Sequence, residues 1–215
     1  MVAPRPANFQ IFVGVGSFYT YADMPDAEYN NKKFRHFVLW KFIEGSVVGD
    51  MTKINDNTSL TTGLDYTKKY AFCIAAAYGE GNEYEISEYT SYIICHPLQS
   101  PLPVIQNFST IEKDKKINLS WDASSPTFEN RNFEEYVIYR YEEGVTAPIK
   151  FSAYTNAYID TNIEKGKKYA YTIATLYSHD RSAKCQGRNY ALSSYCKYIF
   201  ITTKKYFMSI TVSHA

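Results

Sequence analysis

Apolar and polar residues alternate along several short segments of the chain, as expected of β-strands with one buried face. In the second half, Ile117, Leu119 and Trp121 alternate with polar neighbours, and residues 169–175 follow the same pattern. Residues 70–76 repeat it in the first half. No long stretch carries a sustained apolar stripe at helical spacing. The pattern predicts an all-β protein.

An internal repeat organises these segments. Three pairs of similar segments share one offset of 99 residues, which chance rarely produces in a chain of 215. The pairs are 34–45 with 133–144, 68–78 with 167–177, and Asn8-Phe9 with Asn107-Phe108. The chain therefore contains two copies of one unit of about 100 residues.

The border between the copies is predicted at a proline-rich segment. His96 to Pro103 contains three prolines, which cannot donate to a sheet ladder, so it is a junction and not a central strand. The predicted domains are residues 1–98 and 99–203, and residues 204–215 form a tail or a strand extension. Glycine and Asn/Asp clusters punctuate about seven strands per copy, which favours two tandem β-sandwiches.

Several motifs resemble those of fibronectin type III domains. In the second copy they are Pro101-Leu102-Pro103, Trp121, the string Glu135 to Arg140, Ile163 six residues before Tyr169, and Leu192-Ser193-Ser194-Tyr195. The first copy keeps Leu64 six residues before Tyr70, but Ala22 stands where the tryptophan is expected. The resemblance covers nearly the whole chain and implies immunoglobulin-like sandwiches of this type, with the first copy divergent.

Tyr70 and Tyr169 are interpreted as structural residues. Each ring is expected to pack into the core while its hydroxyl bonds to the chain a few residues upstream. Trp121 is interpreted as the core residue between the two sheets of its copy, and not as a ligand platform.

Composition excludes several classes of protein. The chain has 23 Lys and Arg against 22 Asp and Glu, a formal charge of +1, with 45% hydrophobic residues. A highly charged disordered tail and a nucleic-acid binder acting through bulk positive charge are therefore excluded. The apolar runs are too short for membrane insertion, and residues 1–10 lack the apolar core of a signal peptide.

No catalytic or cofactor motif is present. The four histidines are scattered, the four cysteines lack CxxC spacing, and no phosphate-binding GxxxxGK[ST] loop occurs. Ser178-His179-Asp180 contains the residue types of a triad, but neighbours in sequence cannot form the spatial relay. We expect no enzyme activity, no metal and no cofactor.

The cysteines are interpreted as two disulfides, one per copy. An even count allows three pairings, of which the repeat favours Cys73 with Cys95 and Cys185 with Cys196. The alternative is four free thiols in an intracellular protein. Three Asn-x-Ser/Thr sequons, at Asn57, Asn107 and Asn118, are candidate glycosylation sites and agree with secretion.

A long loop near the C-terminus is the most individual feature of the surface. Residues 178–190 make this loop seven residues longer than its counterpart, because the repeat resumes at an offset of 106. Arg181, Lys184 and Arg188 make it basic, and Tyr190 adds an amphipathic contact group. The alternative is a solvated hairpin tip held by a disulfide.

Paired lysines and clustered tyrosines suggest two further surfaces. Lys68-Lys69, Lys167-Lys168, Lys115-Lys116 and Lys204-Lys205 could bind a sulfated glycan, or could merely solubilise. Some of the tyrosines must face outward if the strands alternate, either as a protein contact or as a cross-strand ladder. They are Tyr84, Tyr89, Tyr92, Tyr139, Tyr141, Tyr195 and Tyr198.

The sequence thus predicts a non-enzymatic, protein-binding adhesion module, secreted or at the cell surface. A structural spacer within a larger protein or an intracellular assembly is the alternative. A class II cytokine-receptor-like ectodomain is a lesser one. No nucleic-acid partner is expected.

Overall fold

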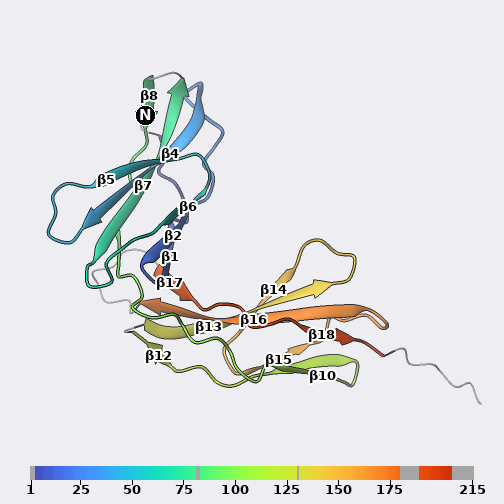
Figure 1. The fold of residues 1–215 in the computed structure, drawn as a ribbon. Helices are drawn as coiled ribbons and strands as arrows, with labels where there is room; N and C mark the ends of the chain where they lie inside the picture. Colours follow the sequence, from blue (N-terminus) through green and yellow to red (C-terminus); the bar gives the residue numbers. More distant parts are fainter. Residues whose placement is uncertain (1–2, 81–82, 130, 180–188, 205–215) are drawn as a thin grey trace, which may run out of the picture. The chain divides into compact units, whose positions relative to one another are not determined.

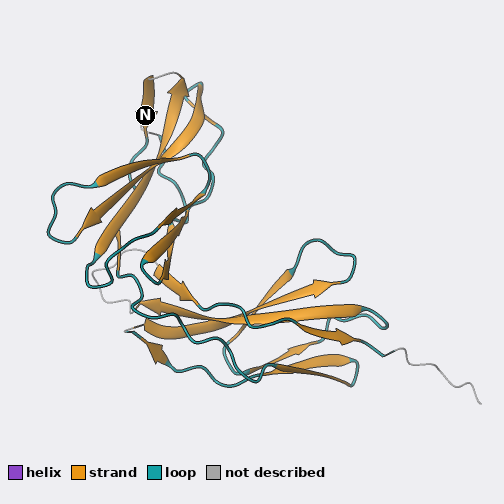
Figure 2. Ribbon diagram, viewed as in Figure 1, coloured by secondary structure: helices purple, strands orange, loops and turns teal. Residues whose placement is uncertain are grey.

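A computed structural model of the chain describes residues 3–80, 83–129, 131–179 and 189–204. In these residues it contains eighteen β-strands. Figures 1 and 2 show strands joined by loops and no helix in this described part. That part of the chain accordingly offers no helix with the length and apolar character needed to cross a membrane. The prediction of an all-β fold is confirmed.

The first copy forms two sheets. Its strands are β1 (Gln10–Gly14), β2 (Ser17–Tyr21), β3 (Glu28–Tyr29), β4 (Lys32–Ile43), β5 (Asp50–Ile54), β6 (Thr58–Thr61), β7 (Tyr70–Glu80), β8 (Glu83–Ile86) and β9 (Ile93–Cys95). β2 pairs with β1 and β6, all antiparallel. β4 pairs with β5 and β7, and β7 pairs with β9. β3 extends the sheet beside β4, and β8 extends it beside β7.

The second copy repeats this plan. Its strands are β10 (Ser109–Lys113), β11 (Lys116–Ser120), β12 (Thr127–Phe128), β13 (Arg131–Glu142), β14 (Ile149–Ala153), β15 (Ala157–Asp160), β16 (Lys168–His179), β17 (Asn189–Leu192) and β18 (Ile199–Thr202). β11 pairs with β10 and β15 in a three-stranded sheet. β14, β13, β16 and β18 lie in that order in a second, larger sheet, which also includes β12 beside β13 and β17 beside β16.

Both copies therefore place one three-stranded sheet and one four-stranded sheet in the same order along the chain. This is the strand order of the fibronectin type III sandwich, so the predicted pair of tandem sandwiches is confirmed. The short strands β3 and β8 in the first copy, and β12 and β17 in the second, are additional to the seven predicted per copy.

The chain divides into two compact units. Unit 1 comprises the chain up to Leu102, together with Thr127–Asn132 and Tyr177–Leu192. Unit 2 comprises Pro103–Pro126, Phe133–Leu176 and the chain from Ser193. Two segments of the second copy thus group with the first copy in this division.

Within unit 1, Glu129 and Arg131 tie down the proline-rich segment. The Glu129 carboxylate accepts hydrogen bonds from the backbone N–H groups of Gln99 at 3.0 Å and Ser100 at 2.9 Å. Nη2 of Arg131 donates to the His96 carbonyl at 2.8 Å, and the side chain is buried. Burial lowers the pKa of Arg131, while the negative charge of Glu129 acts in the opposite direction.

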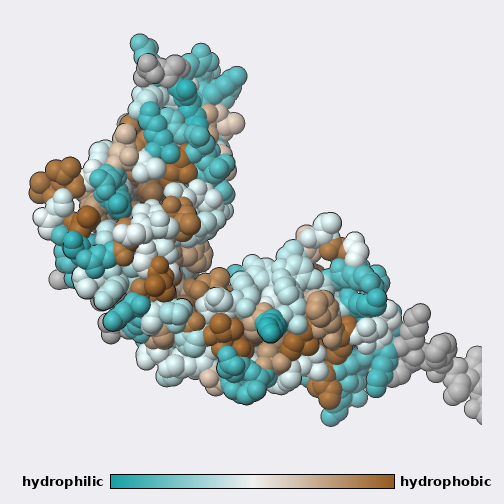
Figure 3. Space-filling view, viewed as in Figure 1, coloured by the Kyte–Doolittle hydropathy of each residue, from teal (hydrophilic) through white to brown (hydrophobic). Residues whose placement is uncertain are grey.

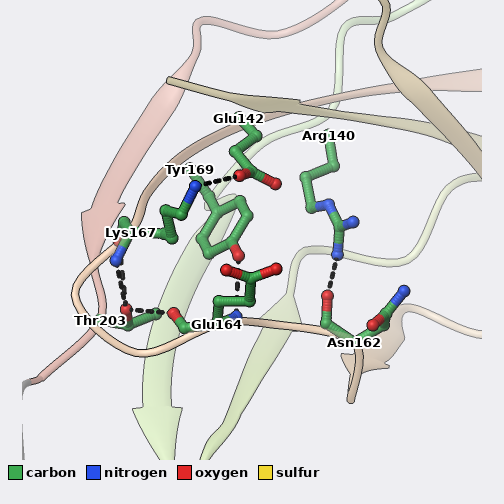
Figure 4. A network of polar contacts seen from close by, with 7 residues as sticks. All are labelled: Arg140, Glu142, Asn162, Glu164, Lys167, Tyr169 and Thr203. Atoms are coloured by element: carbon green, nitrogen blue, oxygen red, sulfur yellow. Dashed lines mark hydrogen bonds and ion pairs between the residues drawn. The ribbon is translucent and has the colours of Figure 1, made fainter. Parts of the chain in front are cut away.

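The two predicted tyrosine corners are present. The Tyr70 hydroxyl accepts a hydrogen bond from the Asp65 N–H at 3.0 Å. The Tyr169 hydroxyl accepts one from the Glu164 N–H at 2.8 Å (Figure 4). Both rings are buried, so each corner fixes the start of β7 or β16 to the preceding loop.

The core of unit 2 is built around Trp121, as predicted. Its indole is only 4% exposed and meets Phe108 and Tyr136 edge to face. In unit 1 the matching residue, Ala22, is also buried. There Phe18 packs edge to face on both Tyr70 and Phe72, with ring centroids 5.7 and 5.2 Å apart, so the core of unit 1 also contains packed aromatic rings.

Candidate functional site

The outward side of the larger sheet carries a cluster of aromatic rings in each unit. We define the aromatic face of unit 1 as Trp40, Phe42, Tyr89 and Tyr92. We define the aromatic face of unit 2 as Tyr139, Tyr141, Tyr195, Tyr198 and Phe200. The first four residues of unit 2 match those of unit 1 at offsets of 99 and 106 residues. The aromatic cluster therefore occurs on matching strands of both units.

In unit 2, strand alternation sets the orientation of this face. Tyr136, Ile138 and Arg140 of β13 are buried, so Tyr139 and Tyr141 between them point outward. Their rings meet those of Tyr195 and Tyr198 in the segment before β18, and Tyr198 in turn meets Phe200 of β18. The contacts are Tyr139 with Tyr195 at 5.7 Å, Tyr141 with Tyr198 at 5.4 Å, and Tyr198 with Phe200 at 6.4 Å between centroids.

Neighbouring hydroxyl groups and burial raise the pKa values of two tyrosines of this face. A hydrogen bond with Tyr198 raises the pKa of Tyr141. Burial raises the pKa of Tyr195, and the neighbouring Tyr139 raises it further. The exposed fraction nevertheless increases along the cluster, from 37% at Tyr195 through 50% at Tyr198 to 78% at Phe200. Phe200 therefore presents most of its ring to solvent.

In unit 1 the same positions form a comparable cluster. The Trp40 indole N–H donates to the Tyr89 hydroxyl at 3.0 Å, and its ring stacks on Phe42 at 5.8 Å. Phe42 meets Tyr92 edge to face at 5.6 Å. Tyr92 is 51% exposed, and it also forms a hydrogen bond with the buried thiol of Cys73 beneath the cluster.

The sequence left two interpretations of the tyrosines open, a protein contact or a cross-strand ladder. The rings do form a cross-strand ladder, and the ladder still exposes aromatic surface. Tyr84 lies elsewhere, edge to face with His36 and under the Lys53 ammonium. Figure 3 shows brown hydrophobic residues interspersed with teal ones on the side of unit 2 that it presents.

Sequence reasoning missed Trp40, Phe42 and Phe200 as members of these faces. The signal was available, because Phe200 lies two residues beyond Tyr198 and Phe42 two beyond Trp40, which is the spacing of one face of a strand. The outward side of this sheet also contains buried residues, namely Thr172 and Ala174 of β16, so burial does not alternate there as the simple strand pattern predicts. This side of the sheet is therefore less exposed to solvent than the outer surface of a simple sandwich.

The long loop does not supply the predicted contact through Tyr190. Arg181, Lys184, Cys185 and Arg188 lie outside the described residues. Tyr190 is on β17, which pairs in parallel with β1, and its ring stacks on Phe12 at 5.7 Å. It is only 8% exposed, so the expectation of an exposed contact group is corrected: this tyrosine packs within unit 1.

The predicted disulfide between Cys73 and Cys95 is wrong. Both residues are buried thiols and are not joined to each other. The register of β7 with β9 puts Cys95 opposite Tyr70, three residues from Cys73, so the two side chains leave opposite faces of the sheet. Burial raises the pKa of Cys73, against the effect of its bond with Tyr92. Cys196 is also a free thiol. Its pairing with Cys185 stays a prediction, since Cys185 lies outside the described residues.

The lysine pairs at the start of β7 and β16 are neutralised in part by acidic neighbours. Lys69 bonds Glu44 at 3.1 Å, and Lys168 bonds Glu143 at 2.8 Å. Lys167 bonds Glu142 at 2.9 Å, a contact that Figure 4 shows. Lys68 lies 3.9 Å from Asp65. Binding of a sulfated glycan remains a prediction, with less uncompensated charge than the sequence suggested.

The three sequons lie in different environments. Asn57 precedes β6, and its backbone carbonyl accepts a hydrogen bond from Ala22 at 3.0 Å. Asn107 donates its side-chain amide to Asp122 at 2.9 Å. Asn118 lies in the middle of β11, between the inward-facing Ile117 and Leu119. Only Asn118 therefore projects from the outer surface of a sheet strand.

A buried ion pair is the strongest electrostatic feature of unit 2. Nη1 of Arg140 contacts Oδ2 of Asp160 at 2.8 Å, with both side chains at most 4% exposed. Arg140 also donates to the Asn162 carbonyl (Figure 4), and the Tyr171 hydroxyl donates to Asp160 at 2.7 Å. Burial by itself lowers the pKa of Arg140, but the bond and charge of Asp160 outweigh it and the pKa is raised. The group is enclosed by the core, so its role is structural.

Unit 1 is expected to lose stability in mild acid because of His36. Its ring is 7% exposed, and burial followed by the charges of Lys53 and Arg35 lowers its pKa. The unfolded chain takes up a proton near pH 6.5, whereas the folded chain resists it, so the free energy of unfolding should fall as the pH drops below about 6.5.

The change that checks this is His36→Phe, which keeps an aromatic ring beside Tyr84. Urea unfolding followed by Trp40 fluorescence, in a Trp121→Phe background so that the signal reports on unit 1, should show a smaller difference between pH 7.5 and pH 5.5 in the variant than in the parent. An equal difference in the two proteins would show that His36 is not the responsible group.

Among the described residues, no group of three or more His, Cys, Asp or Glu side chains could hold a metal ion. The aromatic faces are therefore the strongest candidate for a functional surface.

Comparisons with known proteins add little to what the strand order shows about the fold. No family model matches the chain, and no curated protein matches it. A crystal structure of the FN1–FN3 domains of chicken CNTN1 is similar over 95% of this chain and 69% of that chain, with 13% sequence identity and a TM-score of 0.45. The assignment of the fold rests on the order of the strands within each unit.

Proposed function

We propose that this chain is a non-enzymatic protein-binding module of the adhesion type, and that its partner contacts the aromatic faces. The single observation that supports this is the repetition of an exposed aromatic cluster on the same sheet of both units. Tyrosine and tryptophan supply large contact areas with few rotatable bonds, which is why they are enriched at interfaces.

Stabilisation of the sheet alone accounts for only part of the cluster. Cross-strand aromatic pairs contribute roughly 0.2–1 kcal/mol each, which explains the inner rings. Phe200 is 78% exposed, and it contacts the other aromatic residues of this face through the ring of Tyr198. An exposed phenylalanine beside half-exposed tyrosines is the arrangement of a contact surface. Unit 2 therefore offers the stronger binding face.

Phe200→Glu tests this proposal. The tetramerised 215-residue chain is screened against an array of secreted and cell-surface proteins, and the affinity of each hit is measured by surface plasmon resonance. We expect Phe200→Glu to weaken binding at least about tenfold, the effect of losing about 1.4 kcal/mol, because a charge replaces an apolar contact.

The matched control is Ile111→Glu, which introduces the same charge at an apolar side chain that is 64% exposed on the smaller sheet of unit 2. It should leave the affinity unchanged. If Ile111→Glu weakens binding and Phe200→Glu does not, the partner uses the other sheet. A chain that binds no protein on the array would support the spacer instead.

A further inference from the structure

The smaller sheet of unit 2 carries a row of three side chains in which an asparagine lies between two exposed isoleucines. Ile111 of β10, Asn118 of β11 and Ile159 of β15 are register partners across the three strands. Both isoleucines face solvent, at 64% and 55% exposure. The described side chains give the Asn118 amide no hydrogen-bond partner. Asparagine is disfavoured within strands, so packing does not explain its place here.

Unit 1 provides an internal comparison for this row. The matching residues at an offset of 99 are Phe12, Tyr19 and Leu60, which are also register partners. There the central residue is a tyrosine, whose ring lies 6.3 Å from that of Phe12, while Leu60 on its other side stays 64% exposed. In unit 2 the short amide of Asn118 leaves both isoleucines uncovered.

Asn118 is also the first residue of the sequon Asn118-Leu119-Ser120. Leu119 points into the core, while Ser120 is exposed and its hydroxyl lies 2.9 Å from that of Ser109. The asparagine therefore stands on the outer surface, where a bulky carbohydrate meets no clash with the core. A sugar at this position would occupy the space that Tyr19 occupies in unit 1.

The sequon at Asn107 has a different explanation. Its amide nitrogen, the atom that glycosylation modifies, donates to Asp122 at 2.9 Å, and its backbone has φ of 52°. Asn8 in unit 1 makes the same bond to Asp23 and has φ of 50°. Asn8 is followed by Phe9 and Gln10, which form no sequon. Asparagine is thus needed at this turn whether or not a sequon is present.

We propose that Asn118 is an N-glycosylation site and that its sugar lies over Ile111 and Ile159. In the transfer, Nδ2 of Asn118 forms a bond to the anomeric carbon of the first N-acetylglucosamine of a lipid-diphosphate-linked oligosaccharide. The bond from that carbon to the diphosphate oxygen breaks, the lipid diphosphate leaves with the electron pair, and the amide loses one proton. No oxidation or reduction takes place.

This inference goes beyond the proposed function and stands independently of it. Asn118 lies on the smaller sheet of unit 2, and the aromatic face of that unit lies on the larger one. A glycan at Asn118 would leave Phe200 accessible. Loss of the glycan and loss of partner binding are therefore separate outcomes, each with its own variant.

The site is tested in the full chain secreted from eukaryotic cells behind a cleavable signal sequence. An Asn57→Gln background removes the third sequon, so that any remaining N-glycan is at Asn107 or Asn118. Glycopeptide mapping, with enzymatic release of the glycan, should find Asn118 occupied and Asn107 empty. Secreted protein with Asn118 unmodified would overturn the proposal, and an occupied Asn107 would refute the argument from its hydrogen bond.

The covering role is tested with a dye that fluoresces on apolar surface. Asn118→Gln and Ser120→Ala both abolish the sequon, and the second keeps the asparagine. Both should bind more dye than the glycosylated chain, and a further Ile111→Ser change should reverse the increase. Equal dye binding with and without the glycan would show that the sugar does not cover the isoleucines.

Discussion

Replacing Asp160 with alanine is expected to lower the free energy of unfolding of unit 2 by about 3–5 kcal/mol. Asp160→Ala leaves the Arg140 guanidinium buried without its carboxylate, which lies 2.8 Å away, and removes the acceptor of the Tyr171 hydroxyl. Urea unfolding should be followed by Trp121 fluorescence in a Trp40→Phe background, so that the signal reports on unit 2.

The matched control is Glu143→Ala, which breaks the ion pair with Lys168. Both of those side chains are more than 60% exposed, and such pairs contribute about 0–1 kcal/mol. If Asp160→Ala also lowered the free energy of unfolding by less than about 1 kcal/mol, the buried ion pair would contribute no more to stability than an exposed one.

The buried charges are nevertheless not required by the fold. Unit 1 has Lys41, Thr61 and Phe72 at the positions of Arg140, Asp160 and Tyr171. There Lys41 reaches the exposed Asp50 at 3.0 Å, and Phe72 packs on Phe18. A triple change of Arg140→Met, Asp160→Thr and Tyr171→Phe should therefore recover much of the stability that Asp160→Ala loses, because it removes the stranded charge.

Trp121→Ala is expected to cost about 3–5 kcal/mol in unit 2, the range for removing a large aromatic side chain from a core. The indole is 4% exposed and meets Phe108 and Tyr136, so its removal leaves a cavity between the sheets. Amide hydrogen exchange in β11 and β13 measures the effect, since Trp121 directly follows β11 and its ring meets Tyr136 of β13.

Trp40→Ala is the control within the same chain, which has two tryptophans. It removes one hydrogen bond to Tyr89 and a stacking contact with Phe42 on the outward face, and should cost about 1 kcal/mol in unit 1. If Trp40→Ala proves the more damaging of the two, the aromatic face has a larger structural share than proposed here.

Local pattern was sufficient to predict much of the fold. Alternation at Ile117, Leu119 and Trp121 identified a buried strand face, and burial in the structure agrees. The six-residue spacing before Tyr70 and Tyr169 identified both tyrosine corners. These features depend on residues that are neighbours in sequence, so they can be read without knowing which strands pair.

Register between strands could not be read in this way. Cys73 and Cys95 lie on adjacent strands, but a three-residue offset turns them to opposite faces and rules out a bond. Tyr190 appeared to be a loop residue free to bind a partner, whereas pairing of β17 with β1 buries it against Phe12. Arg140 and Asp160 meet across 20 residues of chain, which no local pattern signals.

The sequence by itself determined that one sandwich is written twice, which core residues each copy uses, and that a structural tyrosine closes each corner, because alternation and repeat spacing are local properties of the chain. Only the tertiary structure decided which outward side chains share a surface. It brought four tyrosine rings together beside Phe200 and placed Asn118 between two exposed isoleucines, because cross-strand neighbours are set by backbone pairing between segments that are distant in sequence.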